Sequence, residues 1–284
     1  MRKFKLTEKA ARRMRGLTET SRTEKKPEGT EKESPRETEQ PSRRLKVTSR
    51  TDVGLVRKNN QDAVILGGEL FGIADGMGGH NGGETASAGA REGMLRETRG
   101  QKPTEKNLEE AIRKVNLALW DRSREEEGLS GMGTTLTVLW PAEDRMLIGH
   151  VGDSRAYLLR DGKLRQVTRD HSMVADMVRR GLLTEEQAAC HPMRNYITRA
   201  VGTEETVQAD VLAFERQRGD RWLVCSDGLH GLVEKQRLQE LMAMADPEEA
   251  ADQMVREALD RGGRDNISLV LAVDEEARAE EAAE

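Results

Sequence analysis

Aspartates stand at the ends of apolar runs in this sequence, and their placement constrains the fold more than any other feature. FGIAD ends at Asp75, IGHVGD at Asp153 and WLVCSD at Asp227, while Asp62 opens DAVIL and Asp265 precedes NISLVLAV. If these runs are strands of one sheet, or of two facing sheets, the five acids can converge at one rim. Converging carboxylates repel one another unless they protonate or share a cation. An all-oxygen site of this kind suits hard ions such as Mg²⁺ or Mn²⁺.

Turn chemistry is the simpler explanation for any one of these acids, because Asp-Gly after a strand is an ordinary turn sequence. Zinc is disfavoured, since no HExxH motif or cysteine cluster occurs. The glycine after Asp75 supports the metal hypothesis, because Gly76 would let a backbone carbonyl or a water approach an ion without a Cβ in the way. Asp161 and Asp170 are interpreted as turn residues.

The pattern of apolar residues predicts strands first, then helices, then strands again. Asp161-Gly162 is a two-residue hairpin signal, and residues 105–126 have one apolar face at helical spacing. Hairpin-linked strands with amphipathic helices predict an α+β fold of antiparallel sheets covered by helices. The expected strands are 45–53, 62–67, 70–75, 132–140, 144–151, 155–160, 163–168, 207–213, 221–226 and 266–273. The expected helices are 82–98, 105–126, 172–180, 234–245 and 247–261.

Charge divides the chain into a basic start and an acidic body. Residues 1–50 hold 16 Lys and Arg against 8 Asp and Glu, and the remaining residues hold 30 against 43. We expect a disordered basic tail over 1–44, one folded domain over 45–273 and an acidic tail over 274–284, because the tails offer little apolar surface to bury. The basic tail could recruit anionic membrane or nucleic acid. We favour an inert or regulatory role and expect no specific nucleic-acid partner.

Two cysteines, Cys190 and Cys225, are too few for a disulfide scaffold and indicate a reducing compartment. The N-terminus lacks the apolar region of a signal peptide, and no run of about 18 apolar residues occurs. The expected location is therefore the cytoplasm. Cysteine phosphatase chemistry is excluded, because neither cysteine is followed six residues later by the arginine that its phosphate-binding loop requires.

Seven segments follow one another in a recognisable order along the chain. They are TDVGLVRKNNQDA (51–63), GIADGMGGHNGGETAS (72–87), GMGTTLTVLW (131–140), HVGDSRAYLLRDGKLRQVTRDHS (150–172), ITRAVG (197–202), LVCSDGLHGLV (223–233) and GGRDNISLVLAV (262–273). Together they resemble the PP2C (PPM) family of metal-dependent Ser/Thr protein phosphatases, in its bacterial single-domain form. The resemblance covers nearly all of residues 50–273.

The resemblance implies a four-layer α-β-β-α sandwich of two antiparallel sheets flanked by helices. It also implies two divalent cations, Mn²⁺ or Mg²⁺, at one end of the sandwich. Arg57 would bind the substrate phosphate, and Asp153, with Asp227, would serve a third and weaker cation site. The implied ligands of the cation pair are Asp62, Asp75, the carbonyl of Gly76, Asp227 and Asp265.

The implied reaction is hydrolysis of phosphoserine and phosphothreonine in proteins. A hydroxide bridging the two cations would attack phosphorus in line. Arg57, Asp62, Asp75 and Asp227 would be the catalytic residues. The implied partners are phosphorylated proteins, among them a bacterial Ser/Thr kinase and its substrates, and the implied state is a monomer. The competing hypothesis is a non-catalytic binding module that keeps the same carboxylates.

Departures from the family pattern affect the surroundings of the predicted site. Gln61 stands where many relatives carry Glu, and Met77 stands where eukaryotic members carry a His credited with protonating the leaving group. The general acid is therefore left open between His80 and a metal-bound water. Residues 170–196 correspond to the family's flap beside the active site. His171 is expected to hold the start of this flap by hydrogen bonding.

Overall fold

Two antiparallel sheets form the centre of the fold in the computed structural model, which describes residues 43–78 and 82–276. One sheet has the strand order β1-β11-β10-β7-β8, and the other has the order β2-β3-β5-β6-β9 with β4 paired to β3. The first sheet contains β1 (Arg43–Asp52), β7 (Arg155–Arg160), β8 (Lys163–Gln166), β10 (Arg221–Cys225) and β11 (Ile267–Glu276). The second contains β2 (Asp62–Gly67), β3 (Leu70–Met77), β4 (Gly133–Thr134), β5 (Leu136–Pro141), β6 (Arg145–Val151) and β9 (Asp210–Glu215).

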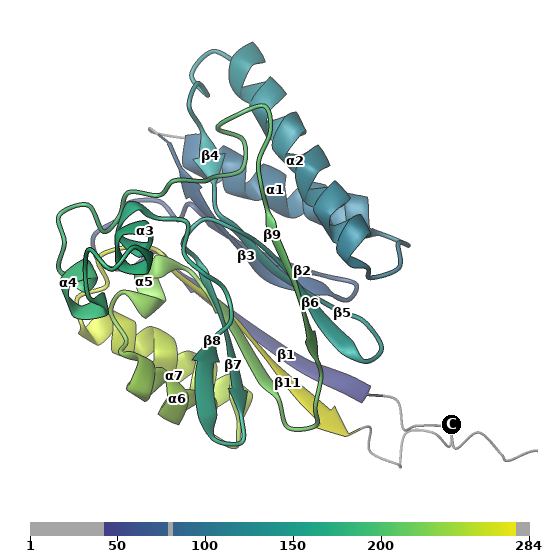
Figure 1. Cartoon of the computed structure of the whole chain (residues 1–284), viewed down its shortest axis with the longest axis vertical. Helices are drawn as coiled ribbons and strands as arrows, with labels where there is room; N and C mark the ends of the chain where they lie inside the picture. Colours follow the sequence, from purple (N-terminus) through teal and green to yellow (C-terminus); the bar gives the residue numbers. More distant parts are fainter. Residues whose placement is uncertain (1–42, 79–81, 277–284) are drawn as a thin grey trace, which may run out of the picture. The chain divides into compact units, whose positions relative to one another are not determined.

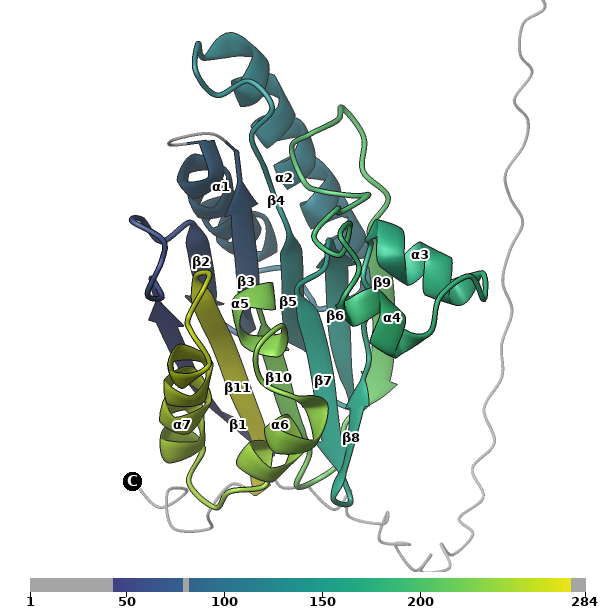
Figure 2. The same ribbon diagram turned by 90° about the vertical axis from the view of Figure 1, so that its left-hand side faces the viewer.

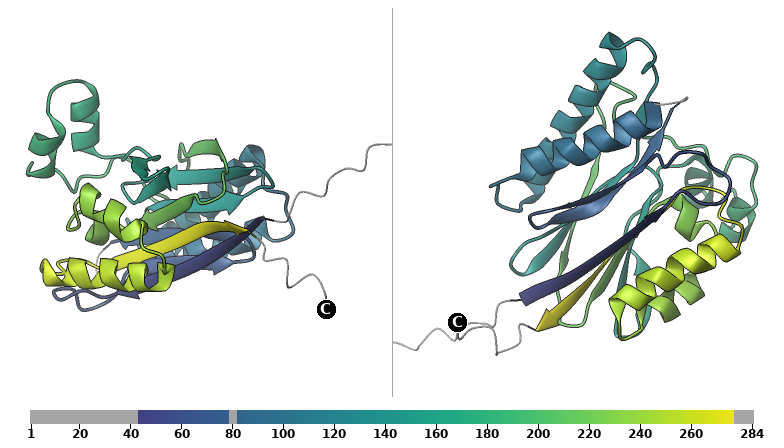
Figure 3. Two further views of the ribbon diagram at one scale, coloured as in Figure 1. Left: turned by 90° about the horizontal axis from the view of Figure 1, so that it is seen from below. Right: turned by 180° about the vertical axis from the view of Figure 1, so that it is seen from behind.

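Helices cover the outer face of each sheet, which makes four layers (Figure 1). The helices are α1 (Gly82–Thr98), α2 (Glu105–Glu125), α3 (Met173–Arg179), α4 (Glu185–Ala189), α5 (Asp227–His230), α6 (Lys235–Met242) and α7 (Pro247–Asp260). Figure 2 shows α5, α6 and α7 in front of the first sheet. Figure 3, in its view from behind, shows α7 along β1 and β11, with α1 and α2 on the other side of the sandwich. The predicted α-β-β-α sandwich is confirmed.

Three apolar cores fill the spaces between the four layers. One lies under α1 and α2 and includes Met94 and Ile112, and another lies under α6 and α7 and includes Leu238 and Met254. The third lies between the sheets and includes Trp222, which is fully buried. Because residues alternate faces along a strand, each sheet supplies two of these cores at once. Strands buried on both faces explain the near-continuous apolar runs of the sequence.

Two Arg–Asp pairs close one end of the sandwich. Arg160 donates from Nε and Nη2 to the two carboxylate oxygens of Asp220, both at 2.7 Å. Arg216 donates from Nε to Asp274 Oδ2 at 2.7 Å, and both aspartates are at most 2% exposed. Bidentate and buried pairs of this kind fix geometry more strongly than exposed ones. This end lies opposite to Asp75, near the end of β3, and to Asp153 and Asp227, which follow β6 and β10.

Most predicted elements are present, and the differences have local causes. The hairpin at Asp161-Gly162 is confirmed, with both residues at positive φ, 51° and 71°. The strand expected over 132–140 is interrupted at Thr135, whose N–H donates to the carbonyl of Asp75 rather than within a regular ladder. The strand expected over 207–213 begins later, at Asp210. The short helices α4 and α5 were not expected.

The expected domain boundaries remain predictions, because residues 1–42 and 277–284 lie outside the described part of the chain. Within the described residues, β1 and β11 pair from Asp52↔Ile267 to Arg43↔Glu276. Paired strands therefore extend two residues before 45 and three residues beyond 273. Asp274, assigned above to the acidic tail, is buried in β11.

His150 in β6 should make the fold sensitive to acid. Burial lowers the pKa of His150 from 6.5 to about 4. The unfolded chain therefore takes up a proton between pH 6.5 and 4 that the folded protein refuses, so the free energy of unfolding falls as the pH drops through that window. The loss should total about 3 kcal/mol. Urea unfolding of wild type and of His150→Gln at several pH values measures it.

The His150→Gln variant should show a shallower slope of unfolding free energy against pH, by up to one proton. His191→Gln is the matched control, because His191 is partly exposed and far along the chain in the flap segment. Equal slopes in all three proteins would contradict the assignment.

Candidate metal centre and phosphate site

Asp62 and Asp75 face each other across neighbouring strands. Asp62 is the first residue of β2, Asp75 lies near the end of β3, and the antiparallel register pairs the two directly. Because β3 also pairs with β4 and β5 on its other edge, the position of Asp75 is fixed from both sides. The second sheet therefore contributes two carboxylates to one rim of the sandwich.

The first sheet contributes its acids at the same rim. Asp227 begins α5 directly after β10, and Asp265 lies just before β11, the strand that pairs with β10. Asp153 lies in the turn between β6 and β7 and so links the two sheets. Asp75 experiences repulsion from all four of the others. The predicted convergence of five carboxylates is therefore present in the structure.

Burial and mutual repulsion make these carboxylates reluctant to ionise together. Burial, followed by repulsion from Asp62 and then Asp227, raises the pKa of Asp75 well above its usual value. Burial also raises the pKa of Asp62. The pKa of Asp227 is raised to about 7 and that of Asp153 to about 6, in each case mainly by burial and then by a neighbouring aspartate. A bound divalent cation would reverse this preference and keep the carboxylates ionised.

Two observations fit these residues to a divalent cation. Asp62 Oδ1 is buried and has no hydrogen-bond partner among the described residues, while Oδ2 accepts from Ser226 Oγ at 2.9 Å. A Cβ placed on Gly76 would lie 2.0 Å from the carbonyl oxygen of Gly83, so no side chain fits beside Asp75. Hard cations bind carboxylate and carbonyl oxygens. Asp62 offers a free carboxylate oxygen, and the absence of a side chain at Gly76 leaves room for a cation to approach its carbonyl.

The side chains as they stand do not form a finished cage. Within residues 43–78 and 82–276, no three or more His, Cys, Asp or Glu side chains are arranged to hold a metal ion between them. The structure thus shows aspartates from both sheets at one rim and a free donor oxygen on Asp62. The ligand roles of Asp62, Asp75, Gly76, Asp153, Asp227 and Asp265 stay predictions.

Polar groups beneath the carboxylates hold the backbone around them. Thr135 Oγ1 accepts from the N–H of Asp75 at 3.0 Å and exchanges a hydrogen bond with Ser154 Oγ at 2.8 Å. Ser226 Oγ, besides donating to Asp62, accepts from the N–H of Ser268 at 3.0 Å. These contacts join β3 to the residue between β4 and β5, and β2 to β11, and they limit how far the carboxylates can separate.

Arg57 lies beside this cluster on the loop between β1 and β2. Its Nη2 donates to Asp265 Oδ2 at 2.7 Å, and its charge also acts on Asp227. The side chain remains 51% exposed. Asn266 holds the loop by donating to the carbonyls of Val53 and Asn59. A guanidinium so placed can reach a phosphoryl group bound at the rim, although its predicted role in phosphate binding is untested.

Arg155 is a residue of the site region that the sequence analysis missed. It donates to both carboxylate oxygens of Asp170, with Nη2–Oδ2 at 2.7 Å, and Gln166 Nε2 donates to Oδ1 of the same aspartate. The interpretation of Asp170 as a turn acid is therefore wrong. Asp170 is the first residue of the expected flap, so Arg155 ties the flap to β7 two residues after Asp153. Position alone gave no signal, since a charged residue within a strand also suits an exposed face.

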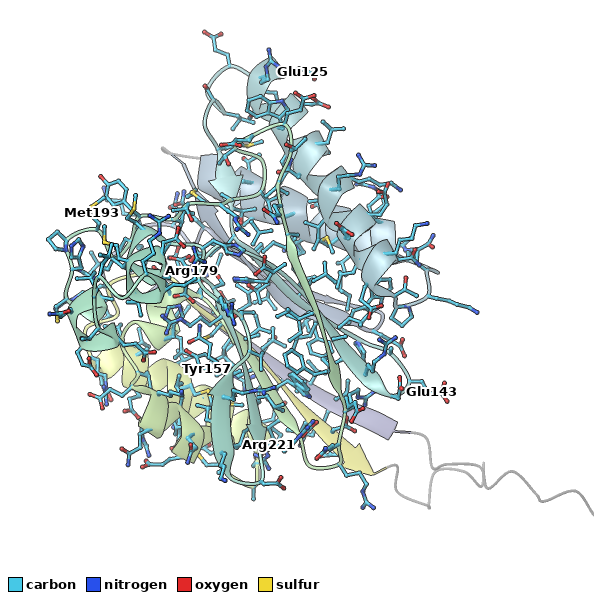
Figure 4. The ribbon with its side chains drawn as sticks, in the orientation of Figure 1. Glu125, Glu143, Tyr157, Arg179, Met193 and Arg221 are labelled. Atoms are coloured by element: carbon cyan, nitrogen blue, oxygen red, sulfur yellow. The ribbon has the colours of Figure 1, made fainter. Side chains whose placement is uncertain are left out.

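The flap segment contains α3, which ends at Arg179, and α4, which precedes Met193. Both residues are labelled in Figure 4. His171 holds its start, as predicted: Nδ1 accepts from the N–H of Gly152 at 3.1 Å, and Nε2 lies 3.3 Å from Asp210 Oδ2. Met77 lines a cavity of about 510 Å³ on the β4 side of β3. His80, the candidate general acid, lies outside the described residues.

Solved structures show which class of protein shares this fold. The crystal structure of the Mycobacterium tuberculosis serine/threonine phosphatase PstP/Ppp superposes with a TM-score of 0.77 at 40% identity, covering 82% of this chain and 99% of that chain. The catalytic domain of PstP in complex with two manganese ions gives a TM-score of 0.75 at 39% identity, covering 81% and 99%. The fold is therefore that of the bacterial serine/threonine phosphatases.

Sequence comparisons then give the family. The model of the family described as protein phosphatase 2C matches residues 55–261. PstP of M. tuberculosis H37Rv is 40% identical over 230 residues, which are 80% of this chain and 45% of that protein. Serine/threonine phosphatase stp of Listeria monocytogenes serotype 4b is 37% identical over 238 residues, 78% of this chain and 93% of that protein. The chain spans about half the length of PstP, and it belongs to the protein phosphatase 2C family, as the resemblance predicted.

Removing one acid should stabilise the metal-free protein. Because the pKa of Asp227 is raised to about 7, its ionisation destabilises the fold increasingly as the pH rises through that value. Asp227→Asn should therefore melt higher than wild type at pH 8, by about 2–4 °C for each kcal/mol of repulsion removed. The difference should shrink at pH 5. Calorimetry in the presence of a chelator measures both.

Asp121→Asn is the matched control, because Asp121 is exposed on α2 and should change the melting temperature little at either pH. A lower melting temperature for Asp227→Asn at both pH values would contradict the repulsion argument.

Proposed function

We propose that this protein hydrolyses phosphoserine and phosphothreonine in proteins with the help of two divalent cations, Mn²⁺ or Mg²⁺. The observation that carries the proposal is the convergence of five aspartates at one rim of a protein phosphatase 2C fold, with Arg57 beside them. A relative's catalytic domain was crystallised in complex with two manganese ions. By extension, the partners are proteins phosphorylated by a Ser/Thr kinase, and the protein acts as a cytoplasmic monomer. In the described ranges, no helix has the length and apolar character needed to cross a bilayer.

The chain's own residues divide the task between holding cations and holding phosphate. Asp62, Asp75, Asp227 and Asp265, with the carbonyl of Gly76, would hold the cation pair, and Asp153 would help to hold a weaker third. When bound, two such cations lower the pKa of a shared water and stabilise the charge that develops on the phosphoryl oxygens.

Arg57 is poised between two partners. Its ion pair with Asp265 occupies the same carboxylate that would bind a cation. A cation on Asp265 would compete for that oxygen and leave the guanidinium available to the substrate. Arg57 can then donate two parallel hydrogen bonds to phosphoryl oxygens, a geometry that its planar fork favours.

Two groups are candidates for supplying the proton of the leaving group. Met77 has no proton to give, and His80 lies outside the described residues. The candidates are therefore His80 and a water held at the cation site. The flap, tied down through Asp170 and His171, would limit access of bulk water to the same rim.

Metal dependence gives the first test. Wild-type protein should hydrolyse p-nitrophenyl phosphate in Mn²⁺ and lose that activity with a chelator, recovering when Mn²⁺ returns. Asp75→Asn should reduce kcat/KM by more than about 100-fold, since even the outer partners of metal ligands are worth about 10–100-fold. Asp121→Asn, folded and fully active, is the control. Wild-type protein that binds Mn²⁺ and a phosphopeptide but does not turn over would instead identify a binding module.

Arg57 gives a second test of the same proposal. Arg57→Ala should lower kcat/KM for p-nitrophenyl phosphate by about 10–100-fold, because a hydrogen bond to a charged group is worth about 1.5–3 kcal/mol. Arg57→Lys should recover only part of the loss, since an ammonium cannot make the two parallel bonds. Lys58→Ala, a neighbouring exposed cation, should retain wild-type kinetics. Equal kinetics for Arg57→Ala and Lys58→Ala would remove Arg57 from phosphate binding.

A further inference from the structure

Three large apolar side chains are exposed together on the loop that carries Arg57. Val53, Leu55 and Val56 are 36%, 68% and 66% exposed, and we call these three residues the apolar step. Among the described residues, the other exposed large apolar side chains are scattered singly over the chain; they are Leu66, Leu117, Leu182 and Tyr196. Single exposed apolar residues are ordinary on protein surfaces, whereas a cluster marks a contact site.

The backbone of the apolar step is fixed in place. The N–H of Leu55 donates to the carbonyl of Gly263 at 2.7 Å, and Asn266 Nδ2 donates to the carbonyl of Val53 at 2.9 Å. Gly54 has φ +77°, and a Cβ there would lie 2.3 Å from the carbonyl oxygen of Asp265. The loop therefore packs closely against the segment before β11, and these contacts restrict its backbone to one conformation. The same contacts fix this backbone next to the carboxylate rim, and the three apolar side chains stay partly or largely exposed there.

The other flank of the rim has a different character. The cavity beside Met77 is lined by more polar than apolar residues, and the polar ones, among them Thr198, Thr203, Glu204 and Gln208, come from the segment after the flap. Within the described residues, the apolar step is thus the surface next to Arg57 that suits an apolar group. A segment lying across the rim would meet apolar residues on one flank and polar residues on the other.

We propose that the apolar step binds a large apolar side chain of the phosphoprotein substrate, close in sequence to the phosphorylated Ser or Thr. This inference rests on the proposed function and adds a substrate preference to it. Arg57, the predicted phosphate-binding residue, directly follows Val56, and an extended chain advances about 3.3–3.6 Å per residue. The apolar residue therefore lies within about three positions of the phosphorylated one.

Charge favours a protein segment over a lipid surface as the occupant. Within residues 51–60 the exposed cations are Arg57 and Lys58, whereas recruitment to an anionic lipid surface takes a local cluster of about 4–8 Lys or Arg. A short apolar contact beside a charged anchor is typical of substrate recognition, in which a few positions give most of the discrimination.

The test uses phosphothreonine peptides that are identical except for Leu or Ser at one position from three residues before to three residues after the phosphothreonine. Phosphate release gives kcat/KM for each. At one or more positions, wild-type protein should prefer Leu by about 10-fold, the lower end of what apolar contacts provide in enzyme specificity. The double variant Leu55→Ser, Val56→Ser should reduce that ratio toward 1. Its kcat/KM for p-nitrophenyl phosphate should stay within about twofold of wild type, because that substrate has no flanking residues.

Leu66→Ser is the matched control, since Leu66 is exposed at the far end of β2 from Asp62. It should keep both the peptide preference and the activity on the small substrate. A wild-type protein without a Leu preference, or a preference that survives in the double variant, overturns the inference while leaving the phosphatase assignment intact. A wild-type dimer that becomes monomeric in the double variant would assign the step to a contact between copies. Failure on every substrate would sink the proposed function and the inference with it.

Discussion

Repulsion between buried carboxylates is the constraint on which this structure depends. Asp75 lies within the influence of four other aspartates that come from both sheets. Nothing in the carboxylates themselves favours this arrangement, so the backbone has to impose it. The strand pairings of β2 with β3, which places Asp62 opposite Asp75, and of β10 with β11 hold the backbone in this position. Their hydrogen bonds form continuous ladders, so one bond cannot break without disturbing its neighbours. The fold is thus a frame that holds like charges closer than they would stay on their own.

The frame is strengthened around the rim by contacts that serve more than one purpose. Ser226 binds both Asp62 and the backbone of Ser268, and Asn266 holds the loop that presents Arg57. Arg155 ties the start of the flap through Asp170. Each of these groups reaches between elements far apart in sequence. Ser226 Oγ also donates to the carbonyl of Asn266 at 3.4 Å, so a change in either residue should disturb the carboxylates and the Arg57 loop together.

Local patterns predicted the antiparallel sheets covered by helices and the converging acids, whereas the four-layer order of the sandwich was implied by the family resemblance. Apolar runs that end in aspartate place an acid at a strand end wherever the strand pairs, and Asp161-Gly162 determines its hairpin without help from the rest of the chain. Features that depend on contacts between distant parts of the chain could not be predicted from the sequence. The sequence EEQAA lacks the spacing of apolar residues that predicts a helix, so α4 was not expected. The start of β9 at Asp210 depends on its pairing with β6, which the sequence does not show. The sequence analysis assigned no role to Arg155, because its contact with Asp170 exists only once the fold brings the two residues together.

The pairing of Arg43 with Glu276 has an engineering consequence. The first and last described residues of the sandwich are neighbours across one ladder, at the end away from the aspartate rim. A short linker could join them and new termini could be opened in an exposed turn, such as the β7–β8 hairpin, without interrupting either sheet. Such a circular permutant would keep the order of strands in space while changing their order of synthesis. The linker would also take the place of residues 1–42 and 277–284.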